Sequence, residues 1–149
     1  MRSIDLTDSR VVVMGLGRFG GGIGVTRWLV GQGARVTVTD RGSAASLRDS
    51  IDQLADVPVT YHLGGHEDSD LDGCDLLVVS PAVDKAKSEF VQEAVRRGIP
   101  LSSEMNLFVE RCPARCIIGV TGSAGKSTTT AMIGSIATAC ARAGRVPAC

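Results

Sequence analysis

Short apolar runs alternate with longer amphipathic stretches along the chain. The apolar runs are rich in Val, Ile and Leu, as buried parallel strands are. They predict strands over 10–15, 35–39, 57–61, 75–79, 99–102 and 116–120, with a Gly/Asp-rich loop over 63–72. The amphipathic stretches predict helices over 20–32, 46–54, 89–97, 103–110 and 126–141. Strands that alternate with helices are typical of an α/β protein whose parallel sheet is covered on both faces.

A short connection, Cys112-Pro113-Ala114-Arg115, separates two parts of this pattern. The first five strands form one parallel sheet and define a first domain over 1–112. The run at 116–120, the loop after it and the last helix begin a second domain over 113–149. This second part is too short to form a domain alone, so we expect the chain to stop inside one. For residues 116–149 the alternatives are docking on the first domain, exchange between two chains in a dimer, and fraying.

Composition narrows the classes of partner. The 149 residues carry 16 Lys plus Arg against 16 Asp plus Glu, so no net field attracts nucleic acid or an anionic membrane. No apolar run approaches the ~20 residues that a membrane-spanning helix needs. Asp5 and Asp8 interrupt any signal-peptide core. The 5 cysteines are irregularly spaced, which favours free thiols in a reducing compartment and hence a cytoplasmic protein.

A first glycine-rich loop follows the strand at 10–15. Gly15-Leu16-Gly17-Arg18-Phe19-Gly20 has the form G-x-G-x-x-G between a strand and a helix. Such glycines permit a tight turn, backbone approach to a phosphate, and close packing of the helix on the strand. Asp40 ends the next strand, where dinucleotide-binding folds place the acid that binds ribose. The first domain is therefore Rossmann-like. The alternatives are a glycine turn without a ligand, and an Asp40 that serves only the turn.

A second glycine-rich loop precedes the last helix. Gly119-Val120-Thr121-Gly122-Ser123-Ala124-Gly125-Lys126-Ser127-Thr128 resembles a triphosphate-binding loop, in which backbone amides and a lysine hold phosphates and a hydroxyl binds Mg²⁺. It departs from G-x-x-x-x-G-K-[ST] by one position, since Val120 stands where glycine is usual. The alternative is a capped helix that contains Gly-Lys-Ser by chance.

Together these motifs resemble the N-terminal part of the Mur ligases, in particular those that add D-glutamate. Those ligases have a G-L-G-x-x-G loop, a strand that ends in Asp, and an S-P-G-type turn, matched here by Ser80-Pro81-Ala82-Val83. An E-x-x-L/F segment and a T-G-S-N-G-K-S-T loop follow, matched by 104–108 and 121–128. The resemblance covers essentially all 149 residues. Ala82 replaces a Gly of the family pattern, and Ala124 replaces an Asn near the phosphates.

The resemblance implies the ligands and the site residues. The first domain would hold the UDP of UDP-N-acetylmuramoyl-L-alanine through Gly15, Leu16, Gly17, Arg18, Phe19, Gly20, Asp40, Arg41, Ser80, Pro81, Ala82 and Val83. ATP would bind Thr121, Gly122, Ser123, Ala124, Gly125, Lys126, Ser127 and Thr128, with Lys126 catalytic and Ser127 on Mg²⁺. The family reaction makes an acyl phosphate that the amine of D-glutamate attacks, in peptidoglycan synthesis. Members of the family are longer than this chain, so the chain alone should not turn over.

Other functions stay open at this point. An NAD-dependent oxidoreductase would use G-x-G-x-x-G and Asp40 but would leave the second loop without a role. A non-catalytic nucleotide-binding module and a ligase for a different amino acid are further alternatives. His62 and His66 have a spacing that suits two metal ligands on a helix, but the glycines between them make a helix improbable there. Trp28 and Phe108 are expected to pack in the core.

Overall fold

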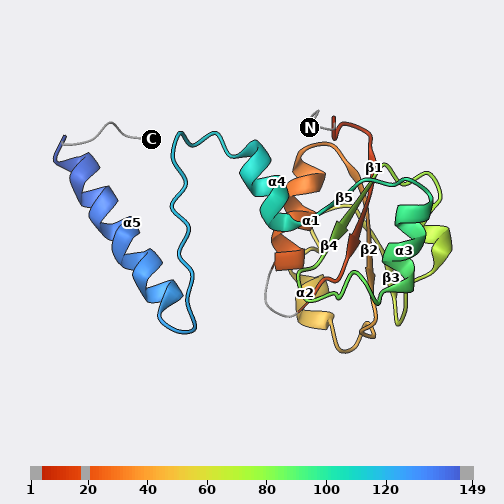
Figure 1. Cartoon of the computed structure of the whole chain (residues 1–149). Coiled ribbons are helices and arrows are strands. Elements are labelled where there is room, and N and C mark those ends of the chain that lie inside the picture. The colour runs from red at the N-terminus through yellow and green to blue at the C-terminus, as the bar shows by residue number, and fades with distance from the viewer. Residues whose placement is uncertain (1–4, 18–20, 145–149) are drawn as a thin grey trace. The chain divides into compact units, whose positions relative to one another are not determined.

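The computed structural model describes residues 5–17 and 21–144 (Figure 1). The predicted ligand residues Arg18, Phe19 and Gly20 therefore lie outside the described residues. The chain divides into two compact units, Met1–Arg111 and Cys112–Cys149.

The first unit contains a five-stranded parallel sheet, as predicted. Its strands are β1 (Arg10–Met14), β2 (Arg35–Asp40), β3 (Val59–Leu63), β4 (Leu76–Val79) and β5 (Leu101–Ser102). They lie in the order β3-β2-β1-β4-β5. Because the chain moves outward from β1 through β2 to β3 and then returns to β4 on the other side, the order reverses between β1 and β4. In open parallel sheets, ligands bind beyond the carboxyl ends of the strands at such a reversal.

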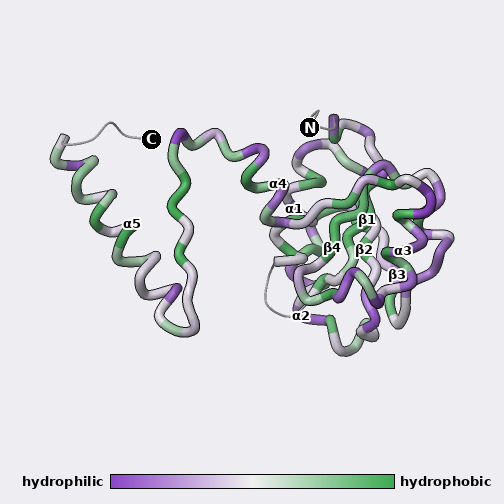
Figure 2. Tube along the Cα trace, in the orientation of Figure 1, coloured by the Kyte–Doolittle hydropathy of each residue, from purple (hydrophilic) through white to green (hydrophobic). Residues whose placement is uncertain are grey.

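Helices cover both faces of this sheet, which confirms the α/β prediction. They are α1 (Gly21–Gly31), α2 (Arg48–Asp52), α3 (Glu89–Arg96), α4 (Glu104–Arg111) and a 3₁₀ turn, η1 (Asp68–Leu71). Successive side chains of β1 enter two separate cores, since Val11 and Val13 pack with α1 and α4 while Val12 packs with α3. Figure 2 shows the apolar residues concentrated along the central strands. Buried on both faces, these strands need the continuous apolar runs that the sequence contains.

Several local predictions in this unit need correction. The fifth strand is limited to Leu101–Ser102 and the second helix to Arg48–Asp52, against 99–102 and 46–54 predicted. The third strand begins at Val59 and extends to Leu63, two residues later than predicted at each end. Val59 is the first residue paired with β2, and Pro58 before it has no N–H to donate to a neighbouring strand. The predicted 63–72 loop also contains η1.

The prediction for Phe108 is wrong. Its side chain is 48% exposed, whereas Leu107 is buried at 4%. One residue turns a helix by about 100°, so the buried Leu107 directs Phe108 away from the sheet. Trp28 packs partly buried against the core, as expected.

The second unit contains one regular element within its described part, the helix α5 (Lys126–Arg142). The predicted strand over 116–120 is absent there, and Ile117 and Ile118 are 46% and 66% exposed. A strand needs a neighbour for its backbone hydrogen bonds. No described segment pairs with 116–120, so its apolar composition alone does not produce a strand. None of the helices in the described chain is long and apolar enough to span a membrane.

Candidate nucleotide site at the reversal of strand order

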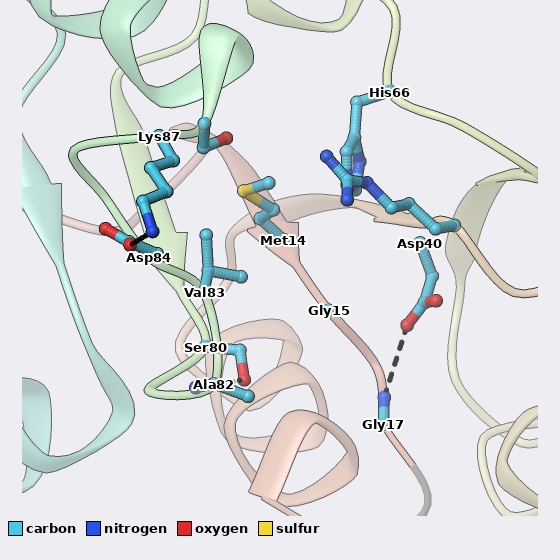
Figure 3. A pocket seen from close by; sticks show the side chains of 12 residues that line it. Met14, Gly15, Gly17, Asp40, His66, Ser80, Ala82, Val83, Asp84 and Lys87 are labelled. Carbon is cyan, nitrogen blue, oxygen red and sulfur yellow. Dashed lines mark hydrogen bonds and ion pairs between the residues drawn. The ribbon is translucent and has the colours of Figure 1, made fainter.

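A cavity of about 400 Å³ opens beside the carboxyl ends of β1 and β4, where the strand order reverses (Figure 3). Four segments meet there: the loop after β1, the end of β2, the loop after β3, and the connection from β4 to α3. The lining residues are Met14, Gly15, Gly17, Asp40, Arg41, His66, Ser80, Ala82, Val83, Asp84, Lys87 and Ser88. A second hollow of about 370 Å³ shares several of these residues and adds Leu16 and Pro81. The predicted first-site residues within the described chain therefore lie together around two adjoining hollows.

Two glycines of the first loop are required by its geometry. Gly15 has φ +94°, and a Cβ atom there would lie 2.9 Å from the Cβ of Ser80. A side chain at this position would clash with Ser80, so glycine is needed for the loop after β1 to lie this close to the end of β4. Gly17 has φ +65°, and a Cβ atom there would meet nothing within 4 Å. Because Gly17 lines both hollows, its bare Cα leaves backbone open to a ligand.

The Asp40 carboxylate holds this loop in place. Oδ2 accepts hydrogen bonds from the backbone N–H groups of Leu16, at 2.8 Å, and Gly17, at 3.3 Å. Oδ1 accepts one from the N–H of Gly42 at 2.7 Å. Both oxygens thus accept hydrogen bonds from the protein's own backbone, and Asp40 connects the end of β2 to the loop after β1. Its contact with a nucleoside stays a prediction.

Asp40→Asn is expected to lower the free energy of unfolding by about 1–3 kcal/mol, because the amide has one acceptor oxygen and its NH₂ would face a backbone N–H. Chemical denaturation of the 149-residue chain measures this change. Asp52→Asn is the matched control, since that exposed carboxylate lies 3.8 Å from Arg48 and accepts no such set of amides. Equal effects of the two substitutions would contradict this role for Asp40.

The connection after β4 forms the opposite wall of the cavity. The N–H of Ser80 donates to the carbonyl of Met14 at 3.0 Å, and the N–H of Val83 donates to the carbonyl of Ser80 at 3.0 Å. The result is a tight turn at 80–83, fixed directly to the end of β1. Lys87 lines the same wall, and its Nζ lies 3.5 Å from an oxygen of Asp84. Among the described residues that line the cavity, Arg41 and Lys87 carry permanent positive charges.

His66 is a cavity residue whose role the sequence reasoning missed. Its Nδ1 lies 2.9 Å from Oγ1 of the buried Thr39, and its ring stacks on Phe90 with centroids 5.3 Å apart. Burial, and then the Arg41 guanidinium, lower the pKa of the imidazole, so it is neutral near pH 7. His62 lies elsewhere, in contact with Asp70. Only its position in the sequence could have indicated His66 as a site residue, since Gly64-Gly65-His66 follows the carboxyl end of a strand.

The family described as "Mur ligase MurD-like, N-terminal domain" matches residues 9–103, the part of the chain that forms this sheet and cavity. The chain belongs to this family. It is 44% identical over 133 residues to the UDP-N-acetylmuramoylalanine--D-glutamate ligase of Roseiflexus sp. (strain RS-1), covering 89% of this chain and 28% of that protein. It is 42% identical over 136 residues to the ligase of the same name from Anaeromyxobacter dehalogenans (strain 2CP-C), covering 91% and 29%. The MurD-like chain thus spans less than a third of the length of these relatives.

Solved structures support the fold. A pseudomurein peptide ligase type C from Methanothermus fervidus superposes with a TM-score of 0.57 at 24% identity, over 86% of this chain and 25% of that one. SirC, a precorrin-2 dehydrogenase, superposes with a TM-score of 0.51 at 17% identity, over 93% and 69%. At these identities the likeness concerns the fold alone. A MurD-like sheet and a dehydrogenase sheet therefore share an architecture, and function must be argued from the site.

The second unit of the MurD-like chain contains the other predicted loop. Gly125 caps α5 in a left-handed conformation, with φ +78°. Lys126 Nζ donates a hydrogen bond to the carbonyl of Gly122 at 2.7 Å, so the amine folds back over the loop. Ser127 and Thr128 lie exposed in the first turn of the helix. Amides at a helix N-terminus and an adjacent amine are groups that hold phosphates, and ATP binding by this loop stays a prediction.

Proposed function

We propose that this chain is the N-terminal part of a ligase that joins D-glutamate to UDP-N-acetylmuramoyl-L-alanine, using ATP, in peptidoglycan synthesis in the cytoplasm. The observation that carries the proposal is the match to the MurD-like N-terminal domain over 9–103, because those residues build the cavity. The names of the relatives from Roseiflexus and Anaeromyxobacter support the substrate class.

The first unit would bind the UDP end of the substrate. The bare backbone at Gly17 leaves room for a phosphate, and Arg41 and Lys87 offset its negative charge. The turn at 80–83 would close the pocket on the other side. A cavity of about 400 Å³ is large enough for a nucleotide and leaves the rest of a longer substrate outside.

The second unit would bind ATP. Lys126 would contact the phosphates, Ser127 would hold Mg²⁺, and residues 121–128 would enclose them. Bound Mg²⁺ would offset charge on the phosphoryl group in transfer. A carboxylate oxygen of the substrate then attacks the γ-phosphorus as ADP leaves, and the amine of D-glutamate displaces phosphate from the acyl phosphate. We propose that turnover needs the rest of the ligase, which is more than two thirds of the length of the relatives.

An NAD-dependent oxidoreductase is less well supported. In such enzymes the acid after the second strand is available to the ribose hydroxyls. Here both oxygens of Asp40 accept backbone N–H groups, so this acid gives NAD no support over a uridine nucleotide. The loop at 121–128 would also have no role in hydride transfer.

Calorimetric titration of the 149-residue chain tests the proposal. We expect heat from UDP-N-acetylmuramoyl-L-alanine and none from NAD⁺ in a parallel cell. Heat from NAD⁺ alone would contradict the ligase proposal and favour an oxidoreductase. Silence from both ligands would contradict a substrate site formed by the first unit alone.

A further inference from the structure

We propose that His66 recognises the base of the bound nucleotide, and that its Nε2 atom accepts a hydrogen bond from the imide N–H of uracil. This inference rests on the proposed function, because it assumes that the cavity holds a uridine nucleotide. It adds a specificity-determining residue that the sequence motifs do not contain.

The hydrogen bonds around Thr39 place the imidazole proton. The hydroxyl of Thr39 has a single proton and lies 3.1 Å from the carbonyl oxygen of Gly65 and 2.9 Å from Nδ1 of His66. A carbonyl oxygen can only accept, so the hydroxyl proton belongs to that bond. The hydroxyl oxygen then accepts from Nδ1, which must carry the ring proton. In the neutral ring, Nε2 is therefore the atom with the free lone pair.

The ring is also fixed in position. Thr39 is fully buried, and Phe90, on which the ring stacks at an interplanar angle of 30°, is only 5% exposed. His66 thus lines the cavity and rests on a buried support (Figure 3). In the part of the chain that the structure describes, no donor is hydrogen-bonded to Nε2. The proposal places this unpartnered acceptor toward the ligand.

A cationic donor lies in the same cavity. Arg41 lines it together with His66, and its positive charge lowers the pKa of the imidazole. Uracil presents an imide N–H between two carbonyl oxygens, so Nε2 can accept from the N–H while a guanidinium donates to a carbonyl. Cytosine has a lone pair on the ring nitrogen at that place, and two acceptors would then face each other. A site built on a hydrogen bond strongly rejects an analogue that lacks it.

The test compares UDP with CDP, which differ only in the base, by titration into the 149-residue chain and its His66→Phe variant. Phenylalanine keeps a ring against Phe90 but has no acceptor. We expect the wild type to prefer UDP by about tenfold or more, and the variant to lose about tenfold in UDP affinity with CDP nearly unchanged. His62→Phe is the matched control, since that histidine contacts Asp70 and does not line the cavity, and it should retain the preference.

The outcomes distinguish a failure of this inference alone from a failure of the proposed function. If the wild type binds neither nucleotide, both fail. If it binds UDP and CDP equally, or if His66→Phe weakens both alike or leaves the preference intact, base recognition by His66 is overturned while the UDP site stands.

The pH dependence of the UDP-to-CDP affinity ratio gives a second readout. Burial and Arg41 lower the pKa of His66 below its usual 6.5, against the opposing carboxylates of Asp40 and Asp70. Protonation turns Nε2 into a donor, so we expect a constant ratio above pH 6.5 and a falling ratio at lower pH. Protonation of the diphosphate changes the affinities of UDP and CDP alike, so it does not change their ratio. His66→Phe should show no such fall, and a wild-type ratio that does not fall at any pH at which the protein stays folded would overturn the inference.

Discussion

Lys126→Ala in the full-length ligase is expected to lower turnover by roughly 10²- to 10³-fold and to leave the affinity for UDP-N-acetylmuramoyl-L-alanine unchanged. The amine of Lys126 lies over the loop, bonded to the carbonyl of Gly122 at 2.7 Å, where it can move onto a phosphate oxygen. Its charge would then offset the charge that develops on the phosphoryl group during transfer. Removing the amine affects a step that follows substrate binding, so kcat should fall while substrate binding remains.

The measurement is phosphate release at saturating substrates, together with calorimetry for the UDP ligand. Arg142→Ala is the matched control, because Arg142 is a cation in the last turn of the same helix and is far along it from the loop. It should keep wild-type turnover. Full activity of Lys126→Ala would remove the ATP-binding interpretation of residues 121–128.

The central strands could be predicted because burial on both faces demands unbroken apolar runs. Val11, Val12 and Val13 show this directly, since each is at most 3% exposed. The strand order could not be obtained from apolar runs alone, because these show which residues are buried and not which strands pair. The same limit explains the error at 116–120. That run has the composition of a strand, but pairing is a property of two segments, and no described segment pairs with it.

The site was predictable where glycine is required and less so where distant side chains meet. Gly15 and Gly17 belong to a motif in which glycine is needed because the backbone adopts positive φ angles and approaches other groups closely. The role of Asp40 depends on a contact with Leu16, 24 residues away, and the role of His66 depends on Thr39, 27 residues away. These contacts arise because the carboxyl ends of parallel strands gather at one edge of the sheet. A histidine after the third strand had no local signal apart from that position.

Gly17→Val is expected to weaken binding of the UDP ligand at least about 100-fold while the fold persists. Gly17 has φ +65°, a Cβ atom there would meet nothing within 4 Å, and the residue lines both hollows. The branched side chain therefore meets the ligand and not the protein. The left-handed backbone adds a loss of roughly 1–2 kcal/mol in the free energy of unfolding.

Gly98→Val separates these two effects. Gly98 follows α3 with φ +71°, and a Cβ atom there would also meet nothing within 4 Å, but the residue does not line the cavity. The two variants should lose similar stability in chemical denaturation, because both place valine in the left-handed region. Calorimetry should then show wild-type affinity for Gly98→Val and no measurable binding for Gly17→Val. Unchanged affinity in Gly17→Val would place the ligand away from the first glycine loop, because no phosphate can approach that backbone past an isopropyl group.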